Sequence, residues 1–217
     1  QKTASAILSG LVGSEMCIRD RSKGERELQK MHNTIKSASS FYNSQVLDYL
    51  NTEMQKFISE QEMVFLSTAD AKGECDASFR AGPKSFIKVL DNHTLIFPEF
   101  KGNGVMASLG NIYENPQIGL MFIDFFSSSI GLHVNGKAEI ITEKEASKFV
   151  NPIDKAKAEK DGQHKTKLWI KIKVEEAYIH CSKHIPKLKK QDKIIHWGTD
   201  DEKLKGGDFF KTKGCDS

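Results

Sequence analysis

The chain has 217 residues, a length that suits one domain with extensions. Its 32 Lys and Arg nearly balance 29 Asp and Glu, and the net charge of +3 is too small for a protein dedicated to coating nucleic acid. No apolar run approaches the roughly 18–20 residues that cross a bilayer, so we expect no membrane contact. The cysteines Cys17, Cys75, Cys181 and Cys215 form no CxxC pair, which argues against a disulfide framework and a structural zinc site. We therefore predict reduced thiols and a cytoplasmic location.

The first 21 residues need an interpretation of their own. Residues 4–12 form a short apolar stretch like a signal-peptide core, but only Lys2 precedes it and no small-x-small cleavage site follows. Residues 16–21 (MCIRDR) back-translate to a sequence that resembles the transposon end of common sequencing-library adaptors. We predict that residues 1–21 are a non-native or disordered leader. Residues 22–186 are predicted to form the main domain with a helical N-terminal extension, and residues 187–217 a C-terminal arm.

Residues 23–59 have a helical pattern, with Ser44 as an expected N-cap. The apolar positions that share one helical face are Val46, Leu47, Leu50, Met54, Phe57 and Ile58. From residue 63 the pattern changes to short apolar or alternating runs separated by turns. It predicts strands at 63–67, 74–79, 86–90, 94–97, 117–124, 132–142 and 168–174, with helices at 105–113 and 143–150. Many short strands with few helices indicate a mainly β fold, an antiparallel barrel or sandwich with helical additions.

An anion site is predicted between residues 78 and 115. Arg80 and Lys84 lie at a strand end beside a turn of small residues, and Lys101 begins a Gly/Asn loop that precedes a helix. Backbone N–H groups at a helix N-terminus, with Lys and Arg nearby, bind phosphate, and Ser108 and Asn111 add neutral hydrogen bonds. Simple turn geometry for the glycines and a surface salt bridge for Arg80 are the alternatives. We expect Arg80 and Lys101 to converge in space.

The order and spacing of several segments resemble the pyridoxamine 5′-phosphate oxidase-related flavoproteins. The similar segments are 65–70, 78–83, 86–91, 94–99, 101–104, 108–112, 115–116, 119–124 and 131–138, and the similarity runs from about residue 24 to residue 186. The resemblance implies an antiparallel FMN-binding split β-barrel that forms a homodimer, with FMN bound at the subunit interface.

The resemblance also implies how FMN is held. Cations and loop residues would bind the phosphate, a short helix would support the phosphate and ribityl oxygens, and backbone groups and an aromatic side chain would meet the flavin ring. The phosphate-binding residues would be Arg80, Lys84, Lys101, Gly102 and Asn103, and the residues of the short helix Ser108 and Asn111. The flavin ring would meet the backbone of Phe86 and Ile87 and the side chain of Phe97. A dianionic phosphate needs such cations and N–H donors, and backbone hydrogen bonds to the ring tune its redox state.

The segment after the last strand departs from the true pyridoxamine phosphate oxidases, which grip their substrate with Arg and His there. Residues 180–186 (HCSKHIP) instead resemble the His-Cys-x-Lys segment of a less characterised branch, so we do not expect oxidation of vitamin B6. Cys181, Lys183 and His184 are weak catalytic candidates; a small buried thiol and a structural histidine are the alternatives. Trp197 is a candidate to cover the partner's flavin.

The leading hypothesis is an FMN-dependent oxidoreductase that acts on an unidentified small molecule and needs no metal. The alternative is a non-catalytic carrier or sensor that binds flavin, deazaflavin or haem, with His133, His180 or His184 as haem ligands. Non-specific RNA binding by the lysine-rich stretches 154–173 and 183–193 is a third interpretation, and we expect no nucleic-acid partner.

Overall fold

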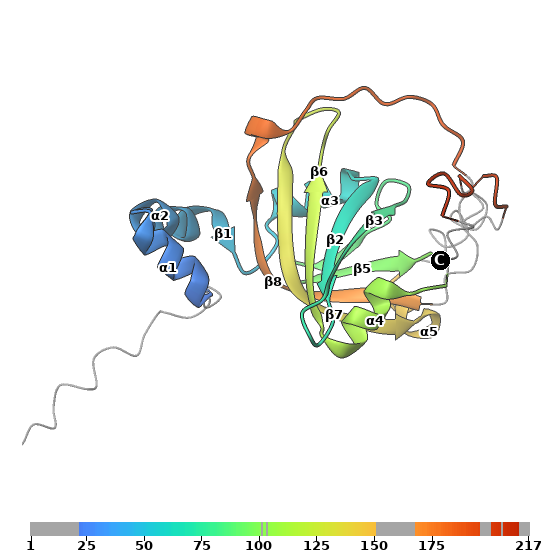
Figure 1. Ribbon diagram of the computed structural model, residues 1–217, viewed down its shortest axis with the longest axis horizontal. Coiled ribbons are helices and arrows are strands. Elements are labelled where there is room, and N and C mark those ends of the chain that lie inside the picture. Colours follow the sequence, from blue (N-terminus) through green and yellow to red (C-terminus); the bar gives the residue numbers. More distant parts are fainter. Residues whose placement is uncertain are drawn as a thin grey trace, which may run out of the picture.

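The computed structural model describes residues 22–100, 102, 104–150, 168–195, 201–204 and 206–212. Within this part of the chain, eight strands form one antiparallel sheet that curls into a barrel (Figure 1). The strands are β1 (Val46–Leu47), β2 (Met63–Ala69), β3 (Cys75–Ala81), β4 (Lys88–Asp91), β5 (Thr94–Glu99), β6 (Gln117–Ile123), β7 (Gly131–Thr142) and β8 (Leu168–His180). The helices are α1 (Lys23–Met31), α2 (Ile35–Gln45), α3 (Thr52–Glu60), α4 (Ala107–Glu114), α5 (Glu143–Ala146) and the 3₁₀ turn η1 (Ser182–His184).

The sheet is open along one side. Its strand order is β3-β2-β6-β7-β8-β5-β4, and the end strands β3 and β4 of the described sheet do not pair with each other. The long strand β8 pairs with β7 along one edge, and with β5 and then β1 along the other. The prediction of a mainly antiparallel split β-barrel is therefore confirmed.

The core lies inside the barrel because alternate residues of each strand point inward. Val64 on β2, Phe122 on β6 and Val134 on β7 are fully buried. Helix α3 adds Ile58, and the helix is held at its start by Asn51, whose side chain accepts a hydrogen bond from the N–H of Met54 at 2.9 Å. The alternation of apolar residues in the sequence thus corresponds to the face of each of these strands that is buried in a common core.

The N-terminal helical prediction needs correction. Residues 23–59 form three helices, and Val46 and Leu47, expected on a helical face, instead form β1 and pair with β8. Ser44 is not an N-cap: it lies near the end of α2, where its hydroxyl donates to the carbonyl of Ser40 at 2.7 Å. The sheet edge of β8 offers Val46 and Leu47 backbone hydrogen bonds that compete with the helix, and this tertiary pairing cannot be read from periodicity.

Several expectations fall on residues outside the described part of the chain. They are the leader 1–21, Lys101, Asn103 and Trp197, the cysteines Cys17 and Cys215, and the lysine-rich residues 154–167. The helix expected at 143–150 is shorter, ending at residue 146. In the described residues, no helix is both long and apolar enough to cross a membrane.

Candidate functional site

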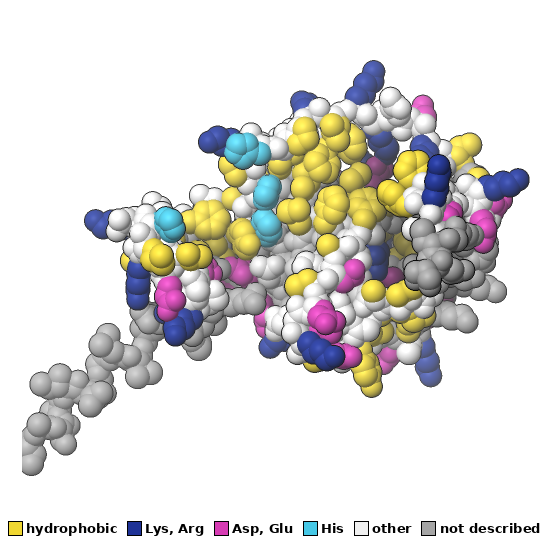
Figure 2. Space-filling view, viewed as in Figure 1, with side chains coloured by type: hydrophobic (Ala, Val, Ile, Leu, Met, Phe, Trp, Pro, Cys, Tyr) yellow, Lys and Arg dark blue, Asp and Glu magenta, His cyan; other side chains and the backbone are white. Residues whose placement is uncertain are grey.

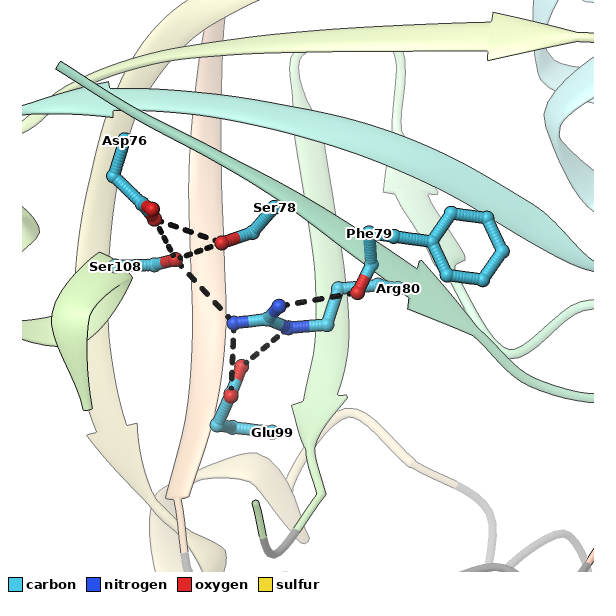
Figure 3. Close-up of polar contacts among 6 residues, drawn as sticks. All are labelled: Asp76, Ser78, Phe79, Arg80, Glu99 and Ser108. Carbon is cyan, nitrogen blue, oxygen red and sulfur yellow. Dashed lines mark hydrogen bonds and ion pairs between the residues drawn. The ribbon is translucent and has the colours of Figure 1, made fainter. Parts of the chain in front are cut away.

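A polar cluster crosses the opening of the barrel (Figure 3). Asp76, Ser78 and Arg80 alternate along β3 and so point to the same side of that strand. The Arg80 guanidinium meets the carboxylate of Glu99, at the end of β5, in two hydrogen bonds: Nε to Oε2 at 3.1 Å and Nη2 to Oε1 at 3.0 Å. Because β3 and β5 lie near opposite ends of the strand order, this ion pair bridges the split in the barrel.

The hydroxyl of Ser108, on α4, joins this ion pair to a second carboxylate. Asp76 Oδ2 accepts hydrogen bonds from Ser78 Oγ at 2.7 Å and Ser108 Oγ at 2.8 Å, while Arg80 Nη2 approaches Ser108 Oγ at 3.5 Å. The bonds from Ser78 and then Ser108 hold the pKa of Asp76 below its ordinary value, helped by the charge of Arg80 and against burial, which raises it. Asp76 is therefore an anion at neutral pH, and the cluster holds two carboxylates and one guanidinium.

Helix α4 adds backbone donors to the cluster. It begins after Met106, which has a left-handed φ of 57° and whose side chain makes no capping hydrogen bond to the first turn. The first amides of a helix have no intrahelical acceptor, so those of Ala107, Ser108 and Leu109 can bind an anion there. Gly102 is exposed in the loop before α4, and Gly104 has a φ of 88° that glycine adopts without strain. The expected convergence of Arg80 with Lys101 stays a prediction.

The other predicted FMN residues take different positions. Asn111 is one turn beyond Ser108 on α4, and its amide donates to Thr68 Oγ1 on β2 at 3.1 Å, which ties the helix to the sheet. Lys84 is exposed in the connection between β3 and β4. Phe86, Ile87 and Phe97 are buried: their side chains belong to the core. Only the backbone groups of these residues remain to meet a ligand, which is what we expected for Phe86 and Ile87. For Phe97 we expected the ring to lie near the flavin, but the ring is buried and has no exposed face.

The weak catalytic candidates lie elsewhere in the chain. Cys181 is an exposed free thiol at the end of β8, and Lys183 and His184 are exposed in η1. Glu99, the partner of Arg80, pairs with Leu168 at the start of β8, whereas these side chains follow the other end of that 13-residue strand, away from the Arg80 cluster. Among the described residues no group of three His, Cys, Asp or Glu side chains is placed to hold a metal ion.

A row of large side chains occupies the outer face of the barrel. Phe79, Phe65, Met121, His133 and Tyr178 stand directly opposite one another on β3, β2, β6, β7 and β8, and we call them the outer row. The rings of Phe65 and Phe79 lie 5.5 Å apart and are 37% and 52% exposed. Figure 2 shows hydrophobic side chains gathered over this part of the barrel, with histidines beside them.

Two histidines meet at the end of the outer row. His133 Nε2 and His180 Nδ1 are 2.9 Å apart and share one hydrogen bond, and the His133 ring stacks on Tyr178 at 4.7 Å. Burial lowers the pKa of His133, the charge of His180 lowers it further, and Glu176 acts in the opposite direction. The neutral form of His133 is thus favoured. The sequence suggested both histidines as possible ligands but not that they are hydrogen-bonded to each other.

Two further residues were missed by the sequence reasoning. The alternation of Asp76 with Ser78 and Arg80 could have indicated that Asp76 belongs to the site, because residues two apart on a strand share a face. Glu99 carries no such local signal: its contact with Arg80 links residues 19 positions apart and exists only in the folded barrel.

Comparison with known proteins gives a family match. The pyridoxamine 5′-phosphate oxidase family profile matches residues 50–181. No curated protein matches the sequence. Solved structures that resemble the chain include HupZ from Group A Streptococcus (25% identity, 60% of this chain and 93% of that one, TM-score 0.44). They also include a protein related to general stress protein 26, of the pyridoxinephosphate oxidase family, from Clostridium acetobutylicum (13%, 59% and 85%, 0.42). A third is the haem storage protein HutZ from Vibrio cholerae (16%, 60% and 94%, 0.40).

The profile match covers more than half of the chain, including the strands and the helix that carry the Arg80 cluster. This chain belongs to the pyridoxamine 5′-phosphate oxidase family.

Proposed function

We propose that the chain is an FMN-dependent oxidoreductase that acts on a small molecule as a homodimer. The observation that carries this proposal is the Arg80 cluster, where a guanidinium at the barrel opening lies beside the N-terminus of α4, whose N-cap residue Met106 offers no side-chain hydrogen bond. This donor set fits a phosphate group. One N–H of Arg80 Nη1 remains beyond the described contacts, and the first amides of α4 and the hydroxyl of Ser108 add further donors.

The edges of the open sheet suit the rest of FMN. Strands β3 and β4 end the described strand order, so each has an edge whose backbone N–H and C=O groups are not used by the sheet. The backbone of Phe86 and Ile87, just before β4, is our candidate to hydrogen-bond the polar rim of the flavin ring. Bound FMN would supply two-electron redox chemistry. The residues of the chain would hold its phosphate, orient its ring and exclude water from it.

The homodimer is part of this proposal. Phe65 and Phe79 in the outer row leave apolar surface exposed, and such surface commonly marks an interaction site. We propose that a second copy covers it. Phe79→Asp should shift the protein from dimer to monomer in light scattering. Phe210→Asp, which changes an even more exposed aromatic residue in the C-terminal arm, should not. A cytoplasmic location also remains our prediction.

A single purification tests the cofactor assignment. We expect a yellow protein that releases FMN, identified by mass spectrometry, and whose flavin is bleached by NADH or NADPH over many turnovers. Arg80→Ala combined with Lys101→Ala should weaken FMN binding at least about tenfold, because charge-assisted hydrogen bonds are lost. A colourless protein that binds no FMN on titration would refute the proposal.

A carrier or sensor function is the second candidate. It is favoured by the His133–His180 pair, which presents imidazole nitrogens beside an exposed apolar surface, a combination suited to haem. The same absorbance spectrum separates the candidates, because haem gives an intense Soret band and flavin does not. Bound flavin that is never turned over would identify a flavin carrier.

A further inference from the structure

Glu99 occupies the part of Arg80 that would grip a phosphate most strongly. A guanidinium has five N–H donors in a planar fork, and its strongest contact with an oxyanion uses two parallel N–H groups. Here Nε and Nη2 both donate to Glu99, Nη1 donates to the Phe79 carbonyl at 3.2 Å, and Nη2 also faces Ser108. A phosphate that approaches Arg80 therefore meets one remaining N–H of Nη1, with the Glu99 carboxylate close by.

Among the described side chains of the Arg80 cluster, the charges have a net negative sum. Asp76 on β3 and Glu99 on β5 contribute −2, Arg80 contributes +1, and α4 brings the uncharged Ser108 to the cluster. Glu99 and Arg80 are only 17% and 19% exposed, so water screens their charges incompletely. Asp76 is held by two hydroxyls, whereas Glu99 lies directly on the guanidinium. Glu99 is therefore the carboxylate that an incoming phosphate would approach most closely.

From this geometry we propose that Glu99 sets the charge preference of the anion site, favouring a singly charged phosphate over a doubly charged one. The inference rests on the proposed function, because it takes the Arg80 cluster as the phosphate subsite of FMN. Each added negative charge on the ligand is repelled by Glu99 at short range. A phosphate monoester changes from one to two negative charges near pH 6. Glu99 thus makes phosphate recognition weaken as the pH rises through this range.

The test compares FMN with riboflavin, which has the same ring and no phosphate. The quantity of interest is the ratio of the riboflavin Kd to the FMN Kd, measured by flavin fluorescence quenching at pH 5 and pH 8. In the wild-type protein this ratio should fall between pH 5 and pH 8. In Glu99→Gln it should be about tenfold higher than wild type at pH 8 and about threefold higher at pH 5, because the phosphate carries about two negative charges at pH 8 and one at pH 5.

Three variants separate charge from geometry. Glu99→Asp keeps the charge and should retain the wild-type pH dependence. Asp76→Asn removes the more distant carboxylate and should have a smaller effect than Glu99→Gln. Glu139→Gln removes an exposed carboxylate on β7 that pairs with Lys171 on β8 and is not part of the Arg80 cluster, and it should change nothing. Thermal melts of the flavin-free proteins show whether each variant folds.

The outcomes distinguish this inference from the proposed function. If the wild type binds FMN and the ratio of the riboflavin Kd to the FMN Kd is unchanged or lower in Glu99→Gln, the role of Glu99 is overturned. The flavin assignment then stays intact. Equal behaviour of Glu99→Asp and Glu99→Gln also overturns it, because geometry rather than charge would then matter. FMN binding to Glu99→Gln alone supports the inference. Failure of both proteins to bind FMN overturns the inference and the proposed function together.

Discussion

Asp124 organises the loop between β6 and β7, and its replacement by Asn should destabilise the protein in a pH-dependent way. Its carboxylate accepts hydrogen bonds from the N–H groups of Phe126 (2.9 Å), Ser127 (3.0 Å) and Ser128 (2.7 Å) and from the Ser128 hydroxyl (2.8 Å). Burial raises the pKa of Asp124, but these bonds outweigh burial and lower the pKa to about 2. Asn has the same size as Asp, but its side-chain NH2 group replaces one of the two carboxylate oxygens. That NH2 group is a donor and would face the donors of Ser128.

The magnitude follows from linkage. A fall in pKa from 3.8 to about 2 corresponds to about 2 kcal/mol of folding free energy after allowance for partial exposure. Because the folded-state pKa lies below the ordinary value, this contribution is present above pH 3.8 and is lost as the pH falls through about 2. The Asp124→Asn variant should therefore unfold about 4–8 °C below the wild type at pH 7. The difference should shrink to roughly half at pH 3.

Urea unfolding measured at pH 7, 5 and 3 tests this reasoning. The control is Asp91→Asn, which changes a carboxylate that accepts a backbone hydrogen bond from His93 at 2.8 Å and should have a smaller effect. The same loop holds the start of the C-terminal arm, because the N–H of Leu188 donates to the carbonyl of Phe125 at 2.7 Å. The arm should therefore be cut faster by protease in Asp124→Asn. A loss that is the same at every pH, or no loss at pH 7, would refute the assignment.

Two further predictions concern β7. A Cβ atom at Gly136, at the bulge between β7 and β8, would lie 2.1 Å from the backbone oxygen of Lys173, so Gly136→Ala should lower the free energy of unfolding by about 2 kcal/mol or more. Gly110→Ala, where nothing lies within 4 Å, is the control, and equal stabilities in urea would contradict this packing. The second prediction concerns His133, whose folded-state pKa lies below 6.5 because of burial and then the charge of His180. The neutral form of His133 therefore stabilises the fold above pH 6.5. This contribution is lost as the pH falls through the folded-state pKa. Urea midpoints from pH 8 to 5 should fall less in His133→Asn than in wild type; parallel curves would show that another group titrates.

Local sequence patterns were sufficient to predict most strands and turns of the barrel. The alternation around Val134 on β7 and the turn at Asp91 reflect interactions within a few residues, and the structure has a strand and a turn there. The segments that suggested the family lie within residues 50–181, where the family profile matches. The pattern failed at Val46 and Leu47, because their apolar spacing fits a helix as well as a strand and the free edge of β8 decides between them.

The sequence by itself determined the fold class, the family and the presence of Arg80 and Ser108 near a Gly/Asn loop that precedes a helix, because periodicity, turn residues and motif order are local properties of the chain. Only the tertiary structure decided what surrounds Arg80. The split barrel brings β3 and β5 together across its opening, and so gives Arg80 the partner Glu99 rather than leaving all its donors to a ligand. The physical reason is that ion pairs depend on distance in space, and residues 80 and 99 become neighbours only when the sheet curls.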